Sequence, residues 1–393
     1  MVRGLLEGIG AKNCWTLAEQ IGDETPDGLQ YLLARARWDH DGLRDDVRAF
    51  VGDHLVDRDA VLVVDETGDL KKGTHTVGVQ RQYTGTAGRI ENAQVSVHLT
   101  YATPAGHALI DRELYLPRAW TNDPQRCQVA GIPDDRRFAT KPALAGQMIT
   151  AAVGQVQARW VAGDEVYGAD PRLREQIADL GLGYVLAVAC SHHIPTRNGS
   201  CRVDDLTDQL PATVWRTLSA GAGAKGRRNY RWAKITIDAV SPRVGEHTVL
   251  VRRHPRTGEL AYYRCYSPTP APLTALVRVA GLRWRIEESF QAAKSQTGLD
   301  EHQVRTWTSW YRWHTLVMLA YAFLTVAATI SRRQTPTTPT LIRLSVNEIR
   351  KLFSTLARGT QATIGHVLHW SCWRRQHQAR ARIYHYRQRG HTP

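Results

Sequence analysis

Three acidic side chains, distant from one another along the chain, could act together in one reaction. They are Asp65, Asp164 and Glu287. Carboxylates that gather without opposing cations repel one another unless a divalent cation neutralises them, and such hard oxygen ligands suit Mg²⁺ completed by water and substrate phosphate. Two such ions about 4 Å apart can activate a water and stabilise the leaving oxygen of a phosphodiester. These residues therefore predict phosphodiester cleavage with two Mg²⁺ ions, for which Mn²⁺ is an expected substitute.

Two of these acids follow apolar runs. Asp65 follows the run 61–64, and Asp164 follows the run 160–163. Unbroken apolar runs of this length are typical of strands buried on both faces, and open α/β sheets place their chemistry at strand ends. Residues 66–69 have the composition of a turn, so the alternative that Asp65 only begins a turn stays open.

The third acid lies on a predicted helix that runs from about residue 272 to residue 297. At about 100° per residue, one face of this helix is apolar; its residues are Leu282, Ile286, Phe290 and Ala293. Arg283, Glu287 and Lys294 form a second stripe beside the apolar one, whereas Glu288 is expected to point to solvent. Glu287 is therefore the glutamate aimed along the edge of the core. An exposed ion pair between Arg283 and Glu287, of little consequence, is the alternative.

The order of predicted elements indicates an α/β fold with a mixed sheet flanked by helices. Strand, helix and strand between residues 160 and 189 form a βαβ unit with a parallel pair, and alternating segments between 77 and 101 predict antiparallel strands. Residues 1–56 have helical period, which fits a helix-turn-helix DNA reader or a plain helical bundle. We expect a helical N-terminal DNA-binding segment, a catalytic core in two parts around an antiparallel β insertion, and a basic tail. The corresponding boundaries are 1–56, 57–190, 191–268, 269–331 and 332–393.

Positive charge is concentrated at the end of the chain. The formal net charge is +14, and residues 331–393 carry twelve Lys or Arg against the single acid Glu348. A nearly neutral body with a basic, aromatic-rich tail predicts a polyanionic partner such as nucleic acid, and a solvated terminal helix is the alternative. A basic loop within the insertion could contact phosphates or be a solvated hairpin tip. The candidate DNA-binding residues of the loop and the tail are Lys225, Arg227, Arg228, Arg374 and Arg375.

Cysteine spacing and hydropathy indicate the compartment. The six cysteines are scattered without a CxxC pair, which favours a reducing cytosol over a disulfide framework or a zinc knuckle. The longest apolar stretch, 315–330, has sixteen residues, short of the roughly 20 that span a bilayer. We therefore expect a buried core helix there, no membrane partner and a cytoplasmic location.

Three segments carry a resemblance to a known family. They are VVDETGDLKKG, WVAGDEVYG and LRWRIEESFQAAKSQTGL, and the last is similar to the signature Tyr-x2-Arg-x3-Glu-x6-Lys. Over about residues 10–330 the chain resembles a DDE transposase of a bacterial insertion sequence, with an RNase H-like core and a β insertion before the final glutamate. The resemblance implies that Asp65, Asp164 and Glu287 bind the metal and that Arg283 and Lys294 contact phosphates. One departure is Ala280, which stands where the signature has tyrosine.

The function implied by this resemblance is cut-and-paste transposition of an insertion sequence. Mg²⁺-dependent cleavage of the DNA strand would be followed by strand transfer into target DNA, without a covalent intermediate. The expected partners are double-stranded DNA, as terminal inverted repeats and target, and a second copy of the chain in a homodimer on DNA, associated with the bacterial nucleoid. Two alternatives stay open. One is a catalytically inactive relic that only binds DNA, and the other is an RNase H-like nuclease without strand transfer.

Overall fold

The structure is a computed structural model of the 393-residue chain. It describes residues 1–357 apart from 22, 24, 198, 209, 224–225, 238–243 and 335–339, together with 372, 375–376, 378–384 and 386–387. The strands are β1 (Val61–Leu70), β2 (Gln80–Thr84), β3 (Arg89–Ala102), β4 (His107–Leu114), β5 (Trp160–Gly163), β6 (Gly183–Val188), β7 (His193–Thr196), β8 (Gly199–Arg202), β9 (Arg216–Gly223), β10 (Gly226–Thr236), β11 (Glu246–Arg253) and β12 (Leu260–Ser267). The helices are α1 (Val2–Leu5), α2 (Cys14–Ile21), α3 (Asp27–Ala34), α4 (His40–His54), α5 (Arg118–Thr121), α6 (Pro124–Ala130), α7 (Lys141–Ala152), α8 (Glu165–Gly168), α9 (Pro171–Asp179), α10 (Val203–Asp208), η1 (Ala212–Val214), α11 (Leu273–Leu282), α12 (Arg285–Ala292), the π turn η2 (Ala293–Thr297), α13 (Trp307–Gln334) and α14 (Val346–Ala357).

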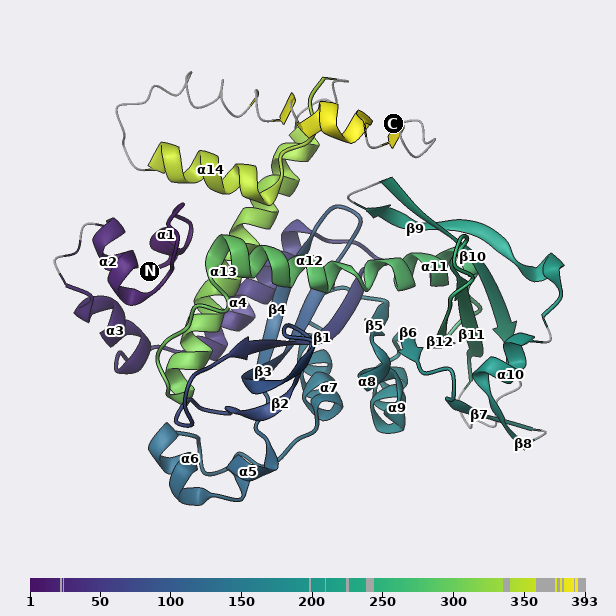
Figure 1. The fold of residues 1–393 in the computed structure, drawn as a ribbon, viewed down its shortest axis with the longest axis horizontal. Coiled ribbons are helices and arrows are strands. Elements are labelled where there is room, and N and C mark those ends of the chain that lie inside the picture. The colour runs from purple at the N-terminus through teal and green to yellow at the C-terminus, as the bar shows by residue number, and fades with distance from the viewer. Residues whose placement is uncertain are drawn as a thin grey trace.

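One mixed sheet of ten strands runs through the protein (Figure 1). Its order is β2-β3-β1-β5-β6-β12-β11-β10-β9, and β4 pairs with β3 beside this path. Strands β1, β5 and β6 are parallel neighbours, whereas the other pairs are antiparallel. The predicted α/β class with a mixed sheet flanked by helices is confirmed, and the arrangement is consistent with an RNase H-like fold.

The insertion continues the core sheet. Strand β12 pairs antiparallel with β6, from Tyr262 opposite Val188 to Tyr266 opposite Tyr184. Strands β11, β10 and β9 then extend the sheet outward, as the right-hand part of Figure 1 shows. The antiparallel strands expected between residues 191 and 268 are therefore present, and β12 joins β9 to β11 to the core through its pairing with β6, whereas β7 and β8 form a separate pair.

Strand β1 is longer than its sequence indicates. It runs to Leu70, so Asp65 lies within the strand, and the predicted turn at residues 66–69 is wrong. Strand β3 pairs with every residue of β1, whereas β5 pairs only with Val61 to Val63. Asp65 consequently marks the point where the parallel neighbour ends, although β1 itself continues.

The predicted helix 272–297 is divided. Helices α11 and α12 are separated at Arg283 and Trp284, and a π turn follows α12. Both separating residues keep right-handed backbone angles, and the amide of Ile286 bonds the carbonyl of Arg283, as in one tighter helical turn. Arg283 thus lies at the junction of two helices.

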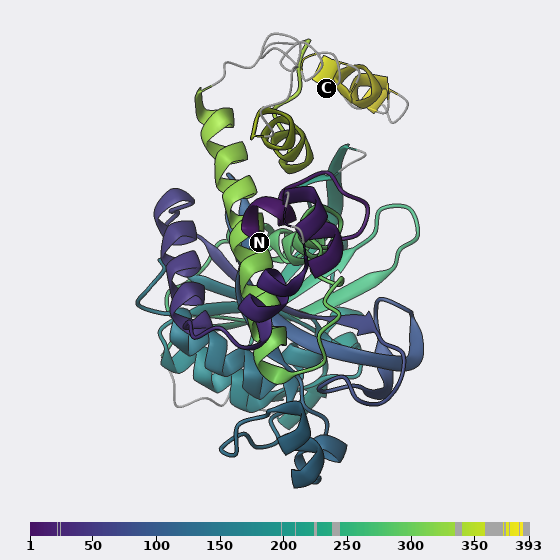
Figure 2. The ribbon, with the colours of Figure 1, turned by 90° about the vertical axis from the view of Figure 1, so that its left-hand side faces the viewer.

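The apolar helix near the C-terminus is α13, which has 28 residues. It is apolar and long enough to span a membrane by composition, but 72% of its most apolar window is buried inside the protein. Elements α1, α3, α4, α14 and β4 pack around it, and Figure 2 shows α1–α3 against it with α14 above them. It is therefore the expected core helix. The last helix of the predicted 1–56 segment, α4, also belongs to this packing.

Candidate active site

Asp65 and Asp164 lie on neighbouring parallel strands. The last bridge between β1 and β5 joins Val63 to Ala162, and each aspartate stands two residues further on. Asp164 also caps α8, because its carboxylate accepts the amide of Val166 at 2.9 Å. Burial, followed by the charges of Asp164 and Glu66, raises the pKa of Asp65 to about 8. The two carboxylates are close enough to repel.

Asp65 faces the helix that carries Glu287. Its cross-strand partner on β3 is His98, whose ring lies 5.4 Å from that of Phe290 on α12. Directly opposed residues of an antiparallel pair point to the same face of a sheet. Asp65 and α12 are therefore on the same side.

Arg283 contacts both Asp65 and Glu287. Its Nη1 lies 3.6 Å from Oδ2 of Asp65, and its Nη2 lies 3.2 Å from Oε1 of Glu287. Burial raises the pKa of Glu287, and the nearby Asp164 carboxylate raises it further, whereas Arg283 lowers it. The structure therefore brings Asp65 and Glu287 together at one guanidinium, and the charge of Asp164 acts on both acids.

The side chain of Glu288, the second glutamate of α12, does not lie where the sequence predicts. Glu288 does not point to solvent: 33% of its side chain is exposed, against 37% for Glu287. It contacts Arg285 and lies 3.3 Å from Nε2 of His107 at the start of β4. Burial alone would raise the pKa of Glu288, but the hydrogen bond with His107 and the charge of Arg285 lower it to about 2. The helical wheel could not show this contact because His107 is distant in sequence.

Two comparisons with known proteins bear on this geometry. A family described as DDE superfamily endonuclease matches residues 1–232, more than half of the chain. The chain belongs to this family. The resemblance to DDE transposases is thereby confirmed, and the matched part of this DDE endonuclease contains Asp65 and Asp164, whereas Glu287 follows it.

A curated relative adds a more specific similarity. The DDE endonuclease is 28% identical over 194 residues to a probable transposase for insertion sequence element IS701 from Microchaete diplosiphon. The match covers 49% of this chain and 48% of the relative, so the chain matches about half the length of that protein.

Sequence reasoning missed three residues of the site. The carboxylate of Glu66 accepts Nζ of Lys141 at 2.6 Å and the hydroxyl of Tyr167 at 2.7 Å. Adjacent residues of a strand point to opposite faces, so Glu66 faces α7 and α8 while Asp65 faces α12. Strand alternation could have indicated this direction, but nothing in the sequence marks Lys141 or Tyr167 as its partners.

The predicted phosphate-contacting residues lie in different surroundings. Lys294, in the π turn η2, lies 3.5 Å from the carbonyl of Gly68 on β1. Arg227 on β10 is exposed, whereas Nη2 of Arg228 donates to the carbonyls of Ala220 and Gly281 at 2.8 and 3.0 Å. Arg375 is buried and donates to the carbonyl of Ile342. Lys225 and Arg374 lie outside the described residues.

The donor chemistry of this DDE endonuclease suits a divalent cation, but the acids do not form a ready cage. The carboxylates of Asp65, Asp164 and Glu287 are oxygen donors of the kind that Mg²⁺ prefers. Among the residues that the structure describes, however, no group of three His, Cys, Asp or Glu side chains is close enough to hold an ion. Arg283 contacts both Asp65 and Glu287.

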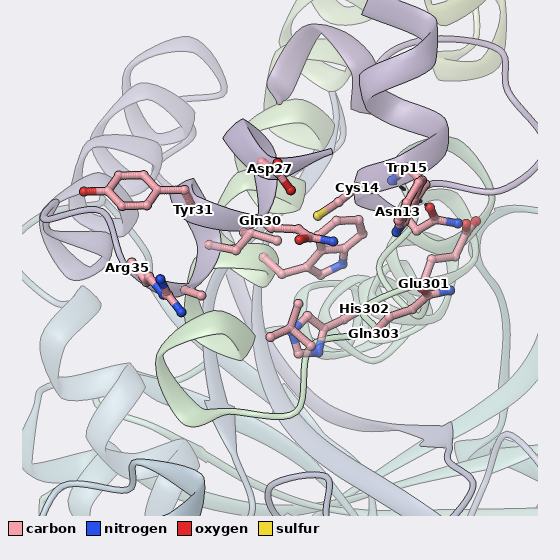
Figure 3. A pocket seen from close by; sticks show the side chains of 14 residues that line it. Asn13, Cys14, Trp15, Asp27, Gln30, Tyr31, Arg35, Glu301, His302 and Gln303 are labelled. Atoms are coloured by element: carbon pink, nitrogen blue, oxygen red, sulfur yellow. Dashed lines mark hydrogen bonds between the residues drawn. The ribbon is translucent and has the colours of Figure 1, made fainter. Parts of the chain in front are cut away.

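A cavity of about 670 Å³ lies away from these acids, between α2, α3 and residues 301–304 (Figure 3). Trp15 and Tyr31, both largely exposed, are among its lining residues, with Asp27, Arg35 and Glu301. None of the three carboxylates lines it. The candidate active site is therefore the region around Arg283, beside the carboxyl end of β5 and the middle of β1.

Proposed function

We propose that this DDE endonuclease is a transposase that cuts the DNA strand at the ends of an insertion sequence and joins them to target DNA. The observation that carries the proposal is that Arg283 contacts both Asp65 and Glu287, while Asp65 and Asp164 lie on neighbouring parallel strands. Family membership and the similarity to a probable insertion-sequence transposase support it.

The roles of the residues follow from their positions. Asp65, Asp164 and Glu287 would hold Mg²⁺ or Mn²⁺, which, when bound, would activate a water and stabilise the leaving oxygen in phosphodiester cleavage. Arg283 and Lys294 would bind phosphates that flank the cleaved bond, with Arg283 suited to bidentate contact. Lys141 and Tyr167 position Glu66, whose charge adds to the negative potential behind Asp65.

The partners would be double-stranded DNA, as terminal inverted repeats and target, and a second copy of the chain on that DNA. The exposed Arg227, together with Lys225, Arg374 and the basic tail, would add sequence-independent affinity through phosphate contacts. The reaction would take place on DNA of the bacterial nucleoid in the cytoplasm.

A strand-nicking assay tests the site. Asp65→Asn, Asp164→Asn and Glu287→Gln keep the side-chain volume and remove the charge, so each should lower Mg²⁺-dependent cleavage by at least ~100-fold, the scale of a lost transition-state contact. Glu165→Gln and Glu288→Gln are matched controls, since each neutralises the neighbour of a candidate ligand, and both should retain cleavage.

Two alternatives predict other products. A relic that only binds DNA would give no nicking by the unaltered protein, and a nuclease without strand transfer would give nicks but no joined molecules. Undiminished cleavage by all three site variants would contradict the assignment of the site.

A further inference from the structure

Arg283 occupies the position where a shared cation of the site would be expected. Its two terminal nitrogens contact different acids, Asp65 at 3.6 Å and Glu287 at 3.2 Å. The side chain is 22% exposed and the two acids are 15% and 37% exposed, so the pairs are neither fully buried nor free in solvent. The guanidinium therefore already contacts two of the carboxylates that a divalent cation would need.

The charge around Arg283 is unbalanced. Four carboxylates, Asp65, Glu66, Asp164 and Glu287, act electrostatically on one another here. Among the described ion pairs of these acids, the cations are Arg283 and Lys141, and Lys141 contacts Glu66 on the other face of β1. The cations that contact these four acids are therefore fewer than the acids.

A guanidinium and a divalent cation cannot share this space at low cost. Both are positive, and like charges a few ångströms apart in a partly buried site repel strongly. The absence of any three-ligand group among the described residues agrees with this exclusion. Binding of the metal therefore requires Arg283 to turn away from Asp65 and Glu287.

A DNA phosphate can supply the alternative partner for Arg283. The planar fork of arginine binds carboxylate and phosphate in the same bidentate way, and this side chain projects from the α11–α12 junction at the partly exposed edge of the site. Only the side chain has to turn, because the junction keeps helical backbone angles.

We infer that Arg283 is a latch that holds Asp65 and Glu287 in the DNA-free protein and exchanges them for a phosphate of the bound DNA. This inference rests on the proposed function. Metal binding is then coupled to DNA binding, and each ligand tightens the other by the same factor. The DNA-free protein therefore binds the metal weakly, and the metal site forms only after DNA has bound.

The test measures Mn²⁺ binding to the full chain without DNA, by the loss of the free-ion signal in electron paramagnetic resonance. Arg283→Gln removes the competing charge, so it should bind Mn²⁺ roughly tenfold or more tightly than the unaltered protein, within the usual range of coupling between sites. Arg285→Gln is the matched control, since Arg285 begins α12 two residues after Arg283 and pairs with Glu288; its Mn²⁺ affinity should equal that of the unaltered protein.

A double variant and a DNA-bound sample show whether the change in Mn²⁺ affinity arises at Asp65 and depends on DNA. Asp65→Asn combined with Arg283→Gln should lose the gain, because the tighter site needs Asp65. A short random-sequence duplex should raise the Mn²⁺ affinity of the unaltered protein but not that of Arg283→Gln. If Arg283→Gln does not fold, Arg283→Lys takes its place, with a smaller expected gain because an ammonium cannot bridge two carboxylates as a planar fork does.

Equal or weaker Mn²⁺ binding by the Arg283 variant overturns the latch. That result is separate from failure of the proposed function. An active unaltered protein whose Arg283 variant gains no Mn²⁺ affinity refutes the latch alone. Unaltered protein that never nicks DNA, with site variants that bind Mn²⁺ as it does, refutes the function.

Discussion

At the scale of single residues, the protein surrounds two buried aspartates in opposite ways. Asp111 on β4 is 1% exposed and lies near three arginines: Arg48 in a short contact, Arg44 at 3.3 Å and Arg112 at 3.7 Å. Asp65 has one arginine at 3.6 Å and two acidic neighbours that raise its pKa. Asp111 is thus a structural ion-pair centre, whereas the negative charge around Asp65 is left for a ligand.

Loss of Asp111 should destabilise the fold strongly. Asp111→Ala leaves Arg48 and Arg112, both fully buried, with less compensating charge, and removing one partner of a buried pair costs about 3–5 kcal/mol. Urea unfolding measures the change in free energy. Asp53→Ala, at an exposed position of α4, is the control and should change stability by no more than about 0.5 kcal/mol. A similar small change for Asp111→Ala would contradict the structural role.

His302 should make stability depend on acidity. Burial, and then the charge of Lys71, lower its pKa from 6.5 to about 3. The unfolded chain therefore binds a proton that the folded protein does not, so stability falls as the pH drops below 6.5 toward 3. His302→Gln removes this titration and should reduce the slope of unfolding free energy against pH by up to about 1.4 kcal/mol per pH unit. Urea unfolding at several pH values between the two pKa values gives the slope.

A matched variant separates this titration from other acid effects. His75 is exposed, so His75→Gln should leave the slope as it is in the unaltered protein. Equal slopes for His302→Gln and the unaltered protein would show that His302 does not cause the loss of stability in acid.

At the scale of elements, β9 of the insertion packs against α11 at Gly281. A Cβ added to Gly281 on α11 would lie 2.2 Å from the carbonyl oxygen of Ala220 on β9. Arg228 donates to the carbonyls of both residues. The edge strand of the insertion is thus held directly against the helix that leads to Arg283.

Gly281→Ala should separate these elements. The methyl group meets backbone that cannot rotate away, so we expect a loss of about 1–3 kcal/mol in stability, the usual cost of overpacking, measured by urea unfolding. Gly28→Ala on α3 is the control, since a Cβ there meets nothing within 4 Å and alanine favours helix by roughly 0.5–1 kcal/mol. Equal stability of the two variants would mean that β9 and α11 do not need this approach.

Sequence predicts what is local and misses what depends on distant partners. The apolar runs before Asp65 and Asp164 were sufficient to predict two buried strands, and the apolar stripe predicted the buried face of α12. The end of β1 was wrong because residues 66–69 have turn composition and only pairing with β3 keeps them extended. The contacts of Glu66 and Glu288, with Lys141 and His107, follow from register between segments, which no short pattern contains.

At the scale of the whole molecule, the C-terminal part returns to the N-terminal helices. The Ser354 hydroxyl on α14 donates to Glu7 at 2.8 Å, and Arg350 donates to the Glu7 carbonyl at 3.0 Å and to Gln296 in η2 at 2.7 Å. Helix α14 therefore links the N-terminal segment to the turn that carries Lys294.

Deletion of residues 358–393 should weaken DNA binding without removing α14. This segment contains seven arginines and no acid, and each lost phosphate contact lowers the slope of log affinity against log salt by about 0.9. Fluorescence anisotropy with a labelled duplex at several salt concentrations measures affinity and slope. Arg89→Gln, at an exposed position of β3, is the control. Identical slopes for the deletion and the unaltered chain would mean that the segment makes no phosphate contacts.

The position of the insertion between Asp164 and Glu287 also determines when the site is completed during translation. A ribosome finishes β1 and β5 early, yet it must add the whole of β7 to β12 before it reaches α12. Any product released by premature termination within those strands contains two acids of the set and lacks the third. On the proposed mechanism such a fragment lacks one of the three proposed metal ligands and should not cleave DNA.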